Sequence, residues 1–284
     1  MLLDFSKMHG LGNDFMLLDL VTQPFEPSPA QIQAWSDRHT GIGFDQLLAI
    51  EPPTDPHADF RYRIFNADGS EAEHCGNGAR CAALFIAARG LSPKRSLVLQ
   101  LTRGTIRVTH LEDGQVEVEM GEPSTAPESL PFIADAPGVN PVAESPGQWL
   151  IDSSVGPVQV FTVSMGNPHA VLFVDNAAHA AVSEIGSALM QHPAFPAGVN
   201  VGFCQVVDGA FLRLRVFERG VGETQACGTG ACAAAVAARL TGRTGPRVKI
   251  SLPGGKVRVA WQGTGSSVNM IGPATLVYQG QIEA

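Results

Sequence analysis

Short apolar stretches separated by turn residues recur along the chain, for example between residues 97 and 119. Residues 97–101, 105–108 and 116–119 are rich in Val, Leu and Ile, and the pairs Arg103-Gly104 and Asp113-Gly114 separate them. Such residues favour strands, whereas Asp-Gly and Arg-Gly pairs favour tight turns. The pattern therefore predicts a high β content with largely antiparallel pairing.

Three longer stretches have the composition of helices. The first, residues 29–39, begins after Ser28, which is a good N-cap residue. The other two, residues 79–89 and 231–240, are rich in Ala, and a glycine that can end a helix follows each of them closely. Both are apolar on nearly every side, so we expect each to run through the middle of a domain with strands packed around it.

A chain of 284 residues is long enough for two domains. We expect an N-terminal domain over residues 1–125, on which the C-terminal segment 273–284 packs back, and a C-terminal domain over residues 126–272. Residues 122–149 show little apolar periodicity and indicate a crossover or linker. The prolines of this stretch are Pro123, Pro127, Pro131, Pro137, Pro141 and Pro146.

The two domains are predicted to be copies of one unit, because the chain contains an internal repeat. Residues 65–79 align with residues 217–231 without a gap, at an offset of 152 residues (227 − 75). Small changes in offset elsewhere are typical of loop insertions in a duplicated domain. Two further matches follow in the same order, Gly12-Asn13 with Gly166-Asn167 at an offset of 154 and residues 43–46 with residues 202–205 at an offset of 159.

The repeat and the two buried helices together define a fold class. We predict an α+β fold of two pseudo-symmetric domains, each a largely antiparallel sheet wrapped around a central helix. Each copy carries Cys-Gly-x-Gly-Ala at the start of its central helix, with Cys75 in the first copy and Cys227 in the second. A pseudo-twofold relation would bring both sulfurs to opposite walls of one cleft.

Two cysteines in this position suit one kind of chemistry. The positive end of a helix lowers the pKa of a cysteine, and the free N–H groups there bind a carboxylate. One sulfur can then remove a proton from an amino-acid α-carbon while the other delivers a proton to the opposite face, which inverts the stereocentre. Cys75 and Cys227 are therefore the candidate acid and base of an epimerase.

The remaining cysteines favour no second site. Five cysteines, an odd number without a secretion signal, indicate reduced thiols, and Cys81, Cys204 and Cys232 are expected to be inert core residues. The spacings from Cys75 to Cys81 and from Cys227 to Cys232 do not suit zinc, so we expect no metal. We also expect no cofactor, because a dinucleotide fingerprint, a phosphate loop and a lysine in a pyridoxal context are missing.

Polar residues near the cysteine motifs suggest the shape of the substrate. Asn66 and Glu218 occupy matched positions nine residues before each cysteine, and an amide opposite a carboxylate can hold an ammonium group. Arg219 could bind a second carboxylate, which implies a substrate with two acidic ends. Surface capping and an ordinary ion pair are the alternatives. His169 either tunes the thiols electrostatically or has a structural role.

Composition excludes some function classes. The net charge is −8 and the Lys and Arg residues form no stripe, so we expect no nucleic-acid partner. No apolar run has the length of a membrane span, and residues 1–7 lack the pattern of a secretion signal. We therefore expect a cytoplasmic protein without a membrane partner.

Taken together, the motifs closely resemble the diaminopimelate epimerase family of lysine and cell-wall precursor biosynthesis. The resemblance covers nearly the whole chain and is far more specific than Cys-Gly-x-Gly alone. It is carried by Lys7-Met8-His9-Gly10-Leu11-Gly12-Asn13-Asp14-Phe15, Gly41-Ile42-Gly43-Phe44-Asp45-Gln46, Asn66-Ala67-Asp68-Gly69-Ser70-Glu71, Cys75-Gly76-Asn77-Gly78-Ala79-Arg80-Cys81, and Gly222-Glu223-Thr224-Gln225-Ala226-Cys227-Gly228-Thr229-Gly230-Ala231-Cys232.

The resemblance implies conversion of LL-diaminopimelate to the meso form without pyridoxal phosphate, by a homodimer, on a substrate with two carboxylates and two amines. Cys75 and Cys227 match the family's acid and base. His169 and Glu218 match residues that tune the thiols, and Tyr278 resembles a tyrosine of the dimer interface. The positions that match substrate contacts are Asn13, Gln46, Asn66, Gly76, Asn77, Asn167, Asn200, Glu218, Arg219, Gly228 and Thr229.

Two other functions compete with this hypothesis. A proline racemase or hydroxyproline epimerase shares the two-cysteine chemistry, but Arg219 together with Asn66 and Asn200 favours a substrate with a distant charged end, which proline lacks. A non-catalytic binding protein of the same fold would not need both cysteines, and both are present.

Overall fold

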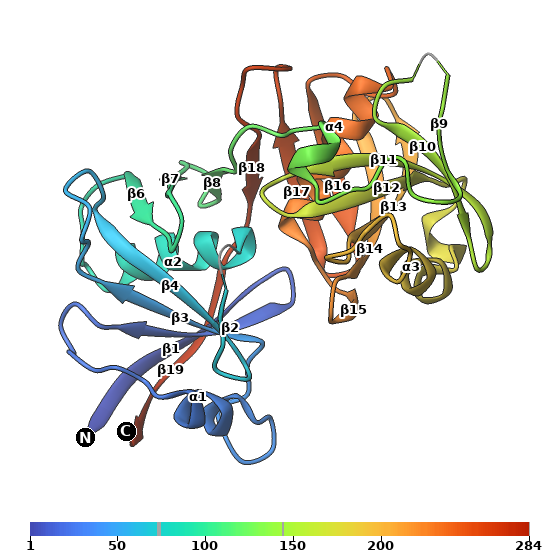
Figure 1. Ribbon diagram of the computed structural model, residues 1–284. Coiled ribbons are helices and arrows are strands. Elements are labelled where there is room, and N and C mark those ends of the chain that lie inside the picture. The colour runs from blue at the N-terminus through green and yellow to red at the C-terminus, as the bar shows by residue number, and fades with distance from the viewer. Residues whose placement is uncertain (73–74, 144, 284) are drawn as a thin grey trace. The chain divides into compact units, whose positions relative to one another are not determined.

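The computed structural model describes residues 1–72, 75–143 and 145–283. The chain divides into two compact units, one made of Met1–Glu119 and Ile271–Ala284 and the other of Met120–Met270. Both units combine a mainly antiparallel sheet with helices, which confirms the predicted α+β class and its duplication (Figure 1). In the part of the chain that is described, no helix is long and apolar enough to cross a membrane.

The first unit is a sheet that surrounds helix α2. Strand β1 pairs antiparallel with β2 and with the C-terminal strand β19, while β2 runs parallel to β3. Strand β4 pairs antiparallel with β3 and parallel with β6, and β6, β7 and β8 form an antiparallel meander. The elements are β1 (Leu2–Gly10), β2 (Asn13–Asp19), α1 (Pro29–Ser36), β3 (Gln46–Glu51), β4 (Phe60–Asn66), β5 (Glu71–Ala72), α2 (Gly76–Ala88), β6 (Ser96–Gln100), β7 (Thr105–His110), β8 (Val116–Glu119) and β19 (Thr275–Glu283).

The second unit repeats this order of pairing. Strand β12 pairs antiparallel with β11 and parallel with β13, and β14 pairs antiparallel with β13 and parallel with β16. Helix α4 has the place that α2 has in the first unit. The elements are η1 (Pro127–Ser129), β9 (Val139–Pro141), β10 (Gln148–Ser153), β11 (Gly156–Ser164), β12 (Pro168–Phe173), η2 (Ala177–His179), α3 (Val182–Met190), β13 (Asn200–Asp208), β14 (Phe211–Glu218), β15 (Gly222–Thr224), α4 (Gly228–Leu240), β16 (Arg247–Leu252) and β17 (Gly255–Ala260). Strand β18 (Asn269–Gly272) begins in the second unit and ends in the first.

Strand register corrects one part of the predicted repeat. In the first unit Phe15 is paired with Gln46, and in the second His169 is paired with Asn200. Gln46 is thus the counterpart of Asn200, at the offset of 154 residues that also relates Asn13 to Asn167. The predicted match between Gln46 and Gln205 is therefore wrong. The error arose because both copies contain Gly-Phe-x-Gln, which lies before and at the start of β3 in the first unit but inside β13 in the second.

The two Ala-rich helices are buried as expected. In α2 ten residues are buried, and in α4 ten residues are buried as well. Strands β1, β2, β3, β7, β8 and β19 contact α2, whereas β11, β12, β13, β14 and β17 contact α4. Small side chains allow strands to approach a helix from several sides, so each helix forms the centre of its unit (Figure 1).

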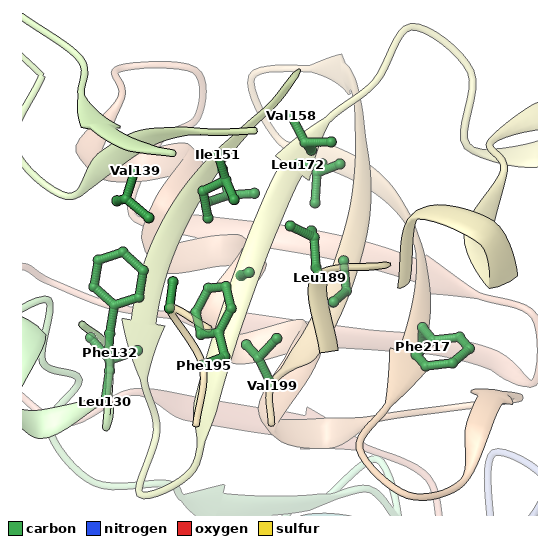
Figure 2. Close-up of a cluster of buried hydrophobic side chains, with 14 of the residues drawn as sticks. Leu130, Phe132, Val139, Ile151, Val158, Leu172, Leu189, Phe195, Val199 and Phe217 are labelled. Carbon is green, nitrogen blue, oxygen red and sulfur yellow. The ribbon is translucent and has the colours of Figure 1, made fainter. Parts of the chain in front are cut away.

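The proline-rich stretch 122–149 was predicted to be a crossover or a linker, and the linker alternative is wrong. It belongs to the second unit, and Leu130, Phe132 and Val139 are buried in the core of that unit. The ring of Phe132 lies 4.9 Å from the ring of Trp149 and 5.1 Å from that of Phe195, as Figure 2 shows for the Phe132 and Phe195 side chains. Prolines remove the regular apolar period, although single residues between them still reach the core.

Close packing requires a glycine at position 78. A Cβ atom there would lie 2.3 Å from the Tyr62 hydroxyl and 3.2 Å from Leu48. We expect Gly78→Ala to lower the free energy of unfolding by about 1–3 kcal/mol, because the buried neighbours must move. Urea denaturation measures this, with Tyr62→Phe and the double variant as controls. The double variant should recover part of the loss, and a Gly78→Ala protein as stable as the wild type would contradict the predicted clash.

Candidate active site

Cys75 is the N-cap residue of α2 in the first unit. Its sulfur accepts a hydrogen bond from the backbone N–H of Gly78 at 3.3 Å, and its thiol donates to Oδ1 of Asn13 at 3.8 Å. The thiol is partly buried, so it is sheltered but can still be reached from solvent. Gly76 and Asn77 form the start of the helix, where N–H groups point outward from the helix end.

Asn77 connects this cysteine to a buried arginine. Its Nδ2 donates to Oδ1 of Asn13 at 3.4 Å, and its own Oδ1 accepts a bond of 2.9 Å from Nη2 of Arg80. Arg80 is fully buried and also donates to the carbonyl oxygen of Pro273 at 3.0 Å. The sequence prediction did not include Arg80, although a charged residue in an otherwise Ala-rich helix was an available signal.

Gln46 and Asn66 form a second polar pair in the first unit. They are paired across β3 and β4, and Nε2 of Gln46 donates to Oδ1 of Asn66 at 2.9 Å. Nδ2 of Asn66 donates to Oγ of Ser70 at 3.0 Å. Gln46 begins β3 and Asn66 ends β4, so both amides lie next to loops, where polar groups can be presented to a ligand.

Cys227 is the N-cap residue of α4 in the second unit. Its sulfur accepts from the N–H of Gly230 at 3.4 Å and lies 3.6 Å from Oγ1 of Thr229. Burial raises the pKa of this thiol well above its ordinary value, and the negative charge of Glu218 raises it further, whereas the bond to Thr229 opposes the shift. Cys227 is therefore a thiol that depends on its immediate partners to ionise.

A chain of hydrogen bonds leads from Thr229 to His169. Nδ2 of Asn167 donates to Oγ1 of Thr229 at 3.3 Å, and Oδ1 of Asn167 lies 2.9 Å from Nε2 of His169. Burial lowers the pKa of His169 to about 3, and the positive charge of Arg219 acts in the same direction. The imidazole is thus neutral near neutral pH, and its Nε2–H donates to Asn167.

Asn200 and Arg219 lie together beside this chain. The amide of Asn200 is buried, and it donates to the carbonyl of Pro168 at 3.2 Å and accepts from the backbone N–H of Arg219 at 2.9 Å. The side chain of Arg219 is exposed and donates to the carbonyl of Ala197 at 3.0 Å. A guanidinium group has five N–H donors, so it can keep this bond and still hold a carboxylate.

The structure links several of the predicted residues to the cysteine of their unit, whereas Gln46 and Asn66 form a separate pair. Asn13 and Asn77 are linked to Cys75, while Glu218, Thr229, Asn167 and His169 are linked to Cys227 directly or through one another. Tyr278 lies apart, in β19 opposite Lys7, with its side chain 44% exposed. All five cysteines lie among the described residues, and none of them forms a disulfide.

His169 makes stability depend on pH. Because its pKa falls from the ordinary value of 6.5 to about 3 on folding, the unfolded chain binds a proton that the folded protein excludes between these values. Stability is complete above pH 6.5 and falls as the pH drops through this window. From pH 7 to pH 5 the wild type should lose about 2 kcal/mol more than His169→Gln in urea denaturation, and equal losses would contradict this.

The sequence as a whole matches one family. A family model described as diaminopimelate epimerase matches residues 5–126 and 161–277. The chain belongs to the diaminopimelate epimerase family. It is 52% identical over 282 residues to the diaminopimelate epimerase of Stutzerimonas stutzeri and 54% identical over 282 residues to that of Azotobacter vinelandii, with 99% of this chain and 99% of each relative covered. These findings confirm the resemblance on which the prediction of the family rests.

Solved structures with the same fold extend beyond diaminopimelate epimerases. A hydroxyproline epimerase from Agrobacterium vitis, with bound trans-4-hydroxy-L-proline, has a TM-score of 0.70 at 15% identity, covering 99% of this chain and 92% of that one. A predicted epimerase from Pseudomonas aeruginosa has a TM-score of 0.67 at 20% identity, with 99% of both chains covered. At these identities the likeness concerns the fold alone.

Proposed function

We propose that this protein interconverts LL- and meso-diaminopimelate, as an isomerase of lysine and cell-wall precursor biosynthesis. The observation that carries the proposal is the pair of cysteines, each capping a buried helix at the same place in a duplicated unit. Relatives at 52% and 54% identity that span 99% of the chain bear the name of this activity.

The proposed reaction is a transfer of two protons at one α-carbon. One cysteine, as thiolate, takes the α-proton, and the electron pair left behind is delocalised into the substrate carboxylate. The other cysteine, as thiol, gives its proton to the opposite face and becomes a thiolate. The backbone N–H groups at the starts of α2 and α4 stabilise the negative charge that develops on the carboxylate.

The polar residues of each unit would recognise the rest of the substrate. Arg219 is proposed to bind the distal carboxylate bidentately, while Glu218 and Asn66 hold ammonium groups. Asn13, Gln46, Asn77, Asn167, Asn200 and Thr229, together with the backbone of Gly76 and Gly228, are proposed to complete the substrate contacts. A substrate with two carboxylates and two amines satisfies this set.

Several further features belong to the same proposal. The reaction needs no cofactor and no metal, because the cysteines and the helix N–H groups supply both the proton transfers and the charge stabilisation. We place the protein in the cytoplasm as a homodimer, without nucleic-acid or membrane partners. The dimer contact would be formed on β19, where Leu276, Val277 and Tyr278 are 40%, 55% and 44% exposed.

The activity can be tested with purified protein in a reducing buffer that contains a metal chelator. LL-Diaminopimelate is added and the isomers are separated by chiral chromatography. We expect conversion toward an equilibrium mixture of the LL and meso forms. L-Proline and trans-4-hydroxy-L-proline serve as alternative substrates because of the fold shared with hydroxyproline epimerase. Conversion of either of these, without conversion of diaminopimelate, would contradict the proposal.

A further inference from the structure

Four charged residues of the first unit form a hydrogen-bonded group that reaches the amide of Asn13 through Asp45. Arg38 donates to both carboxylate oxygens of Asp14, at 2.9 and 2.8 Å, and to Oδ1 of Asp45 at 2.8 Å. Lys7 is buried and donates to Asp14 and to the carbonyl of Gly43. Although burial opposes it, hydrogen bonds from Arg38 and Lys7 hold the pKa of Asp14 well below its usual range. The group is therefore a linked set of ion pairs, in which Lys7 and Asp14 are largely buried and Arg38 and Asp45 are more exposed.

Asp45 determines which way the Asn13 amide points. Oδ2 of Asp45 accepts a bond of 2.9 Å from Nδ2 of Asn13 and one of 3.1 Å from the backbone N–H of Asp14. An ionised carboxylate can only accept hydrogen bonds, so the NH₂ group of Asn13 must face it. The amide oxygen of Asn13 consequently faces the other way, toward the thiol of Cys75 at 3.8 Å and Nδ2 of Asn77 at 3.4 Å.

The second unit has no carboxylate at the position that corresponds to Asp45. With the register established above, the counterpart of Asp45 is Val199, a fully buried apolar residue. There Oδ1 of Asn167 faces His169, and Nδ2 of Asn167 faces Thr229. Thr229 then accepts from Asn167 and has its own hydroxyl proton available for the sulfur of Cys227, 3.6 Å away. Equivalent amides thus present an acceptor to one cysteine and, through Thr229, a donor to the other.

We propose that Asp45 is a positioning residue that fixes the Asn13 amide with its oxygen toward Cys75 and thereby favours the protonated form of this cysteine. This inference rests on the proposed function, in which Cys75 is one member of the acid/base pair. Among the described residues, the other titratable and charged groups near Cys75 are Tyr62 on β4 and Arg80 and Cys81 on α2.

The test compares the reactivity of Cys75 as a function of pH in a Cys227→Ala background. The probe is iodoacetamide, and labelling at Cys75 is quantified by peptide mass spectrometry. The rate at pH 7 is divided by the plateau rate at high pH, which reports the thiolate fraction rather than access. Cys81, Cys204 and Cys232 are fully buried and should label slowly.

Asp45→Asn is the informative variant because it preserves volume. Arg38 and the backbone N–H of Asp14 both donate to this side chain, and the new amide has one oxygen for the two. The charged donor Arg38 makes the stronger bond and holds the oxygen, which leaves the NH₂ group toward Asn13. Asn13 should then turn its own NH₂ group toward Cys75 and stabilise the thiolate. We expect the normalised rate at pH 7 to rise about two- to tenfold, as for the exchange of one hydrogen bond. Asp45→Ala, in which Asn13 is free to turn, should give a rise in the same direction.

Replacing Asp45 also removes a negative charge, which could itself change the thiolate fraction of Cys75. Asn13→Ala separates this effect of charge from the effect of the Asn13 amide orientation. If Asp45 acts through Asn13, Asn13→Ala raises the rate and Asp45→Asn adds nothing in that background. An equal rise in both backgrounds would show a through-space effect, and no rise in either variant of Asp45 would also overturn the proposal. Arg38→Gln keeps the hydrogen bond from Asn13 to Asp45, so the pH dependence of Cys75 labelling should stay unchanged. If Arg38→Gln shifted this pH dependence as Asp45→Asn does, Asp45 would have only a structural role and the proposal would be overturned.

The labelling test of Asp45 and the activity test of the proposed function can fail separately. The labelling reaction reports the state of Cys75 and needs no substrate. If the wild-type protein fails to epimerise diaminopimelate, the proposed function fails, whatever the labelling shows. If it epimerises but Asp45→Asn leaves labelling unchanged, only the role of Asp45 is overturned.

Discussion

Cys75→Ala and Cys227→Ala should each lower kcat for epimerisation by about 10²–10⁴-fold, the usual contribution of a positioned acid or base. Each substitution removes one of the two sulfurs at a helix N-terminus but leaves the N–H groups of that terminus in place. Substrate binding should therefore change much less than turnover. Initial rates with LL- and meso-diaminopimelate, measured under reducing conditions, provide the comparison.

Cys232→Ala is the matched control for these variants. Cys232 lies in α4, five residues after Cys227, and is fully buried. Its loss leaves a small cavity, which should lower stability modestly without a large change in kcat. If Cys75→Ala or Cys227→Ala retained turnover close to that of Cys232→Ala, the two-cysteine mechanism would be wrong.

Arg219→Ala should raise KM for diaminopimelate by about 10–100-fold, because a charged partner of the distal carboxylate is lost. Its side chain is exposed, so the substitution should cost little stability. Arg219→Lys should recover only part of the affinity, since an ammonium group cannot bind a carboxylate in the same bidentate manner.

The change in KM is informative only if it depends on the distal carboxylate. A diaminopimelate analogue with that group amidated should bind the wild type and Arg219→Ala with similar affinity, which the inhibition constants of the two proteins would show. An unchanged KM for diaminopimelate in Arg219→Ala would remove Arg219 from the proposed substrate contacts.

The sequence predicted the parts of the fold that depend on local pattern. The two Ala-rich helices were predicted from their uniform apolar character, and both are buried. Their starts were placed three residues late, at 79 and 231, because Gly76-Asn77-Gly78 and Gly228-Thr229-Gly230 are poor helix formers. The structure begins each helix directly after its cysteine, whose sulfur accepts the N–H of the third helical residue.

Elements without local signals could not be predicted in this way. Helix α3 begins after Ala181, which provides no side-chain cap, and so no start signal marks it. The stretch 122–149 contributes Leu130, Phe132 and Val139 to a core through contacts with residues distant in sequence. Neither its fold nor its burial follows from periodicity, since tertiary packing decides both.

The candidate site was only partly predictable for a related reason. The repeat identified Cys75 and Cys227, and the family resemblance supplied their polar neighbours. The contacts that orient these neighbours depend on strand register and long-range packing. Asp45 and Arg80, which hold Asn13 and Asn77, were therefore not recognised from the sequence. The counterpart of Gln46 was misassigned until register related it to Asn200.

The central claim is that two different groups remove and deliver the proton at one carbon. The most direct test follows epimerisation of LL-diaminopimelate in deuterium oxide to low conversion, with mass spectrometry of both isomers. With two cysteines, the newly formed meso isomer should carry one solvent deuterium at the inverted carbon, while the remaining LL isomer stays largely unlabelled. A meso product that keeps the original proton, or an LL pool that gains deuterium as fast as the product, would contradict the account.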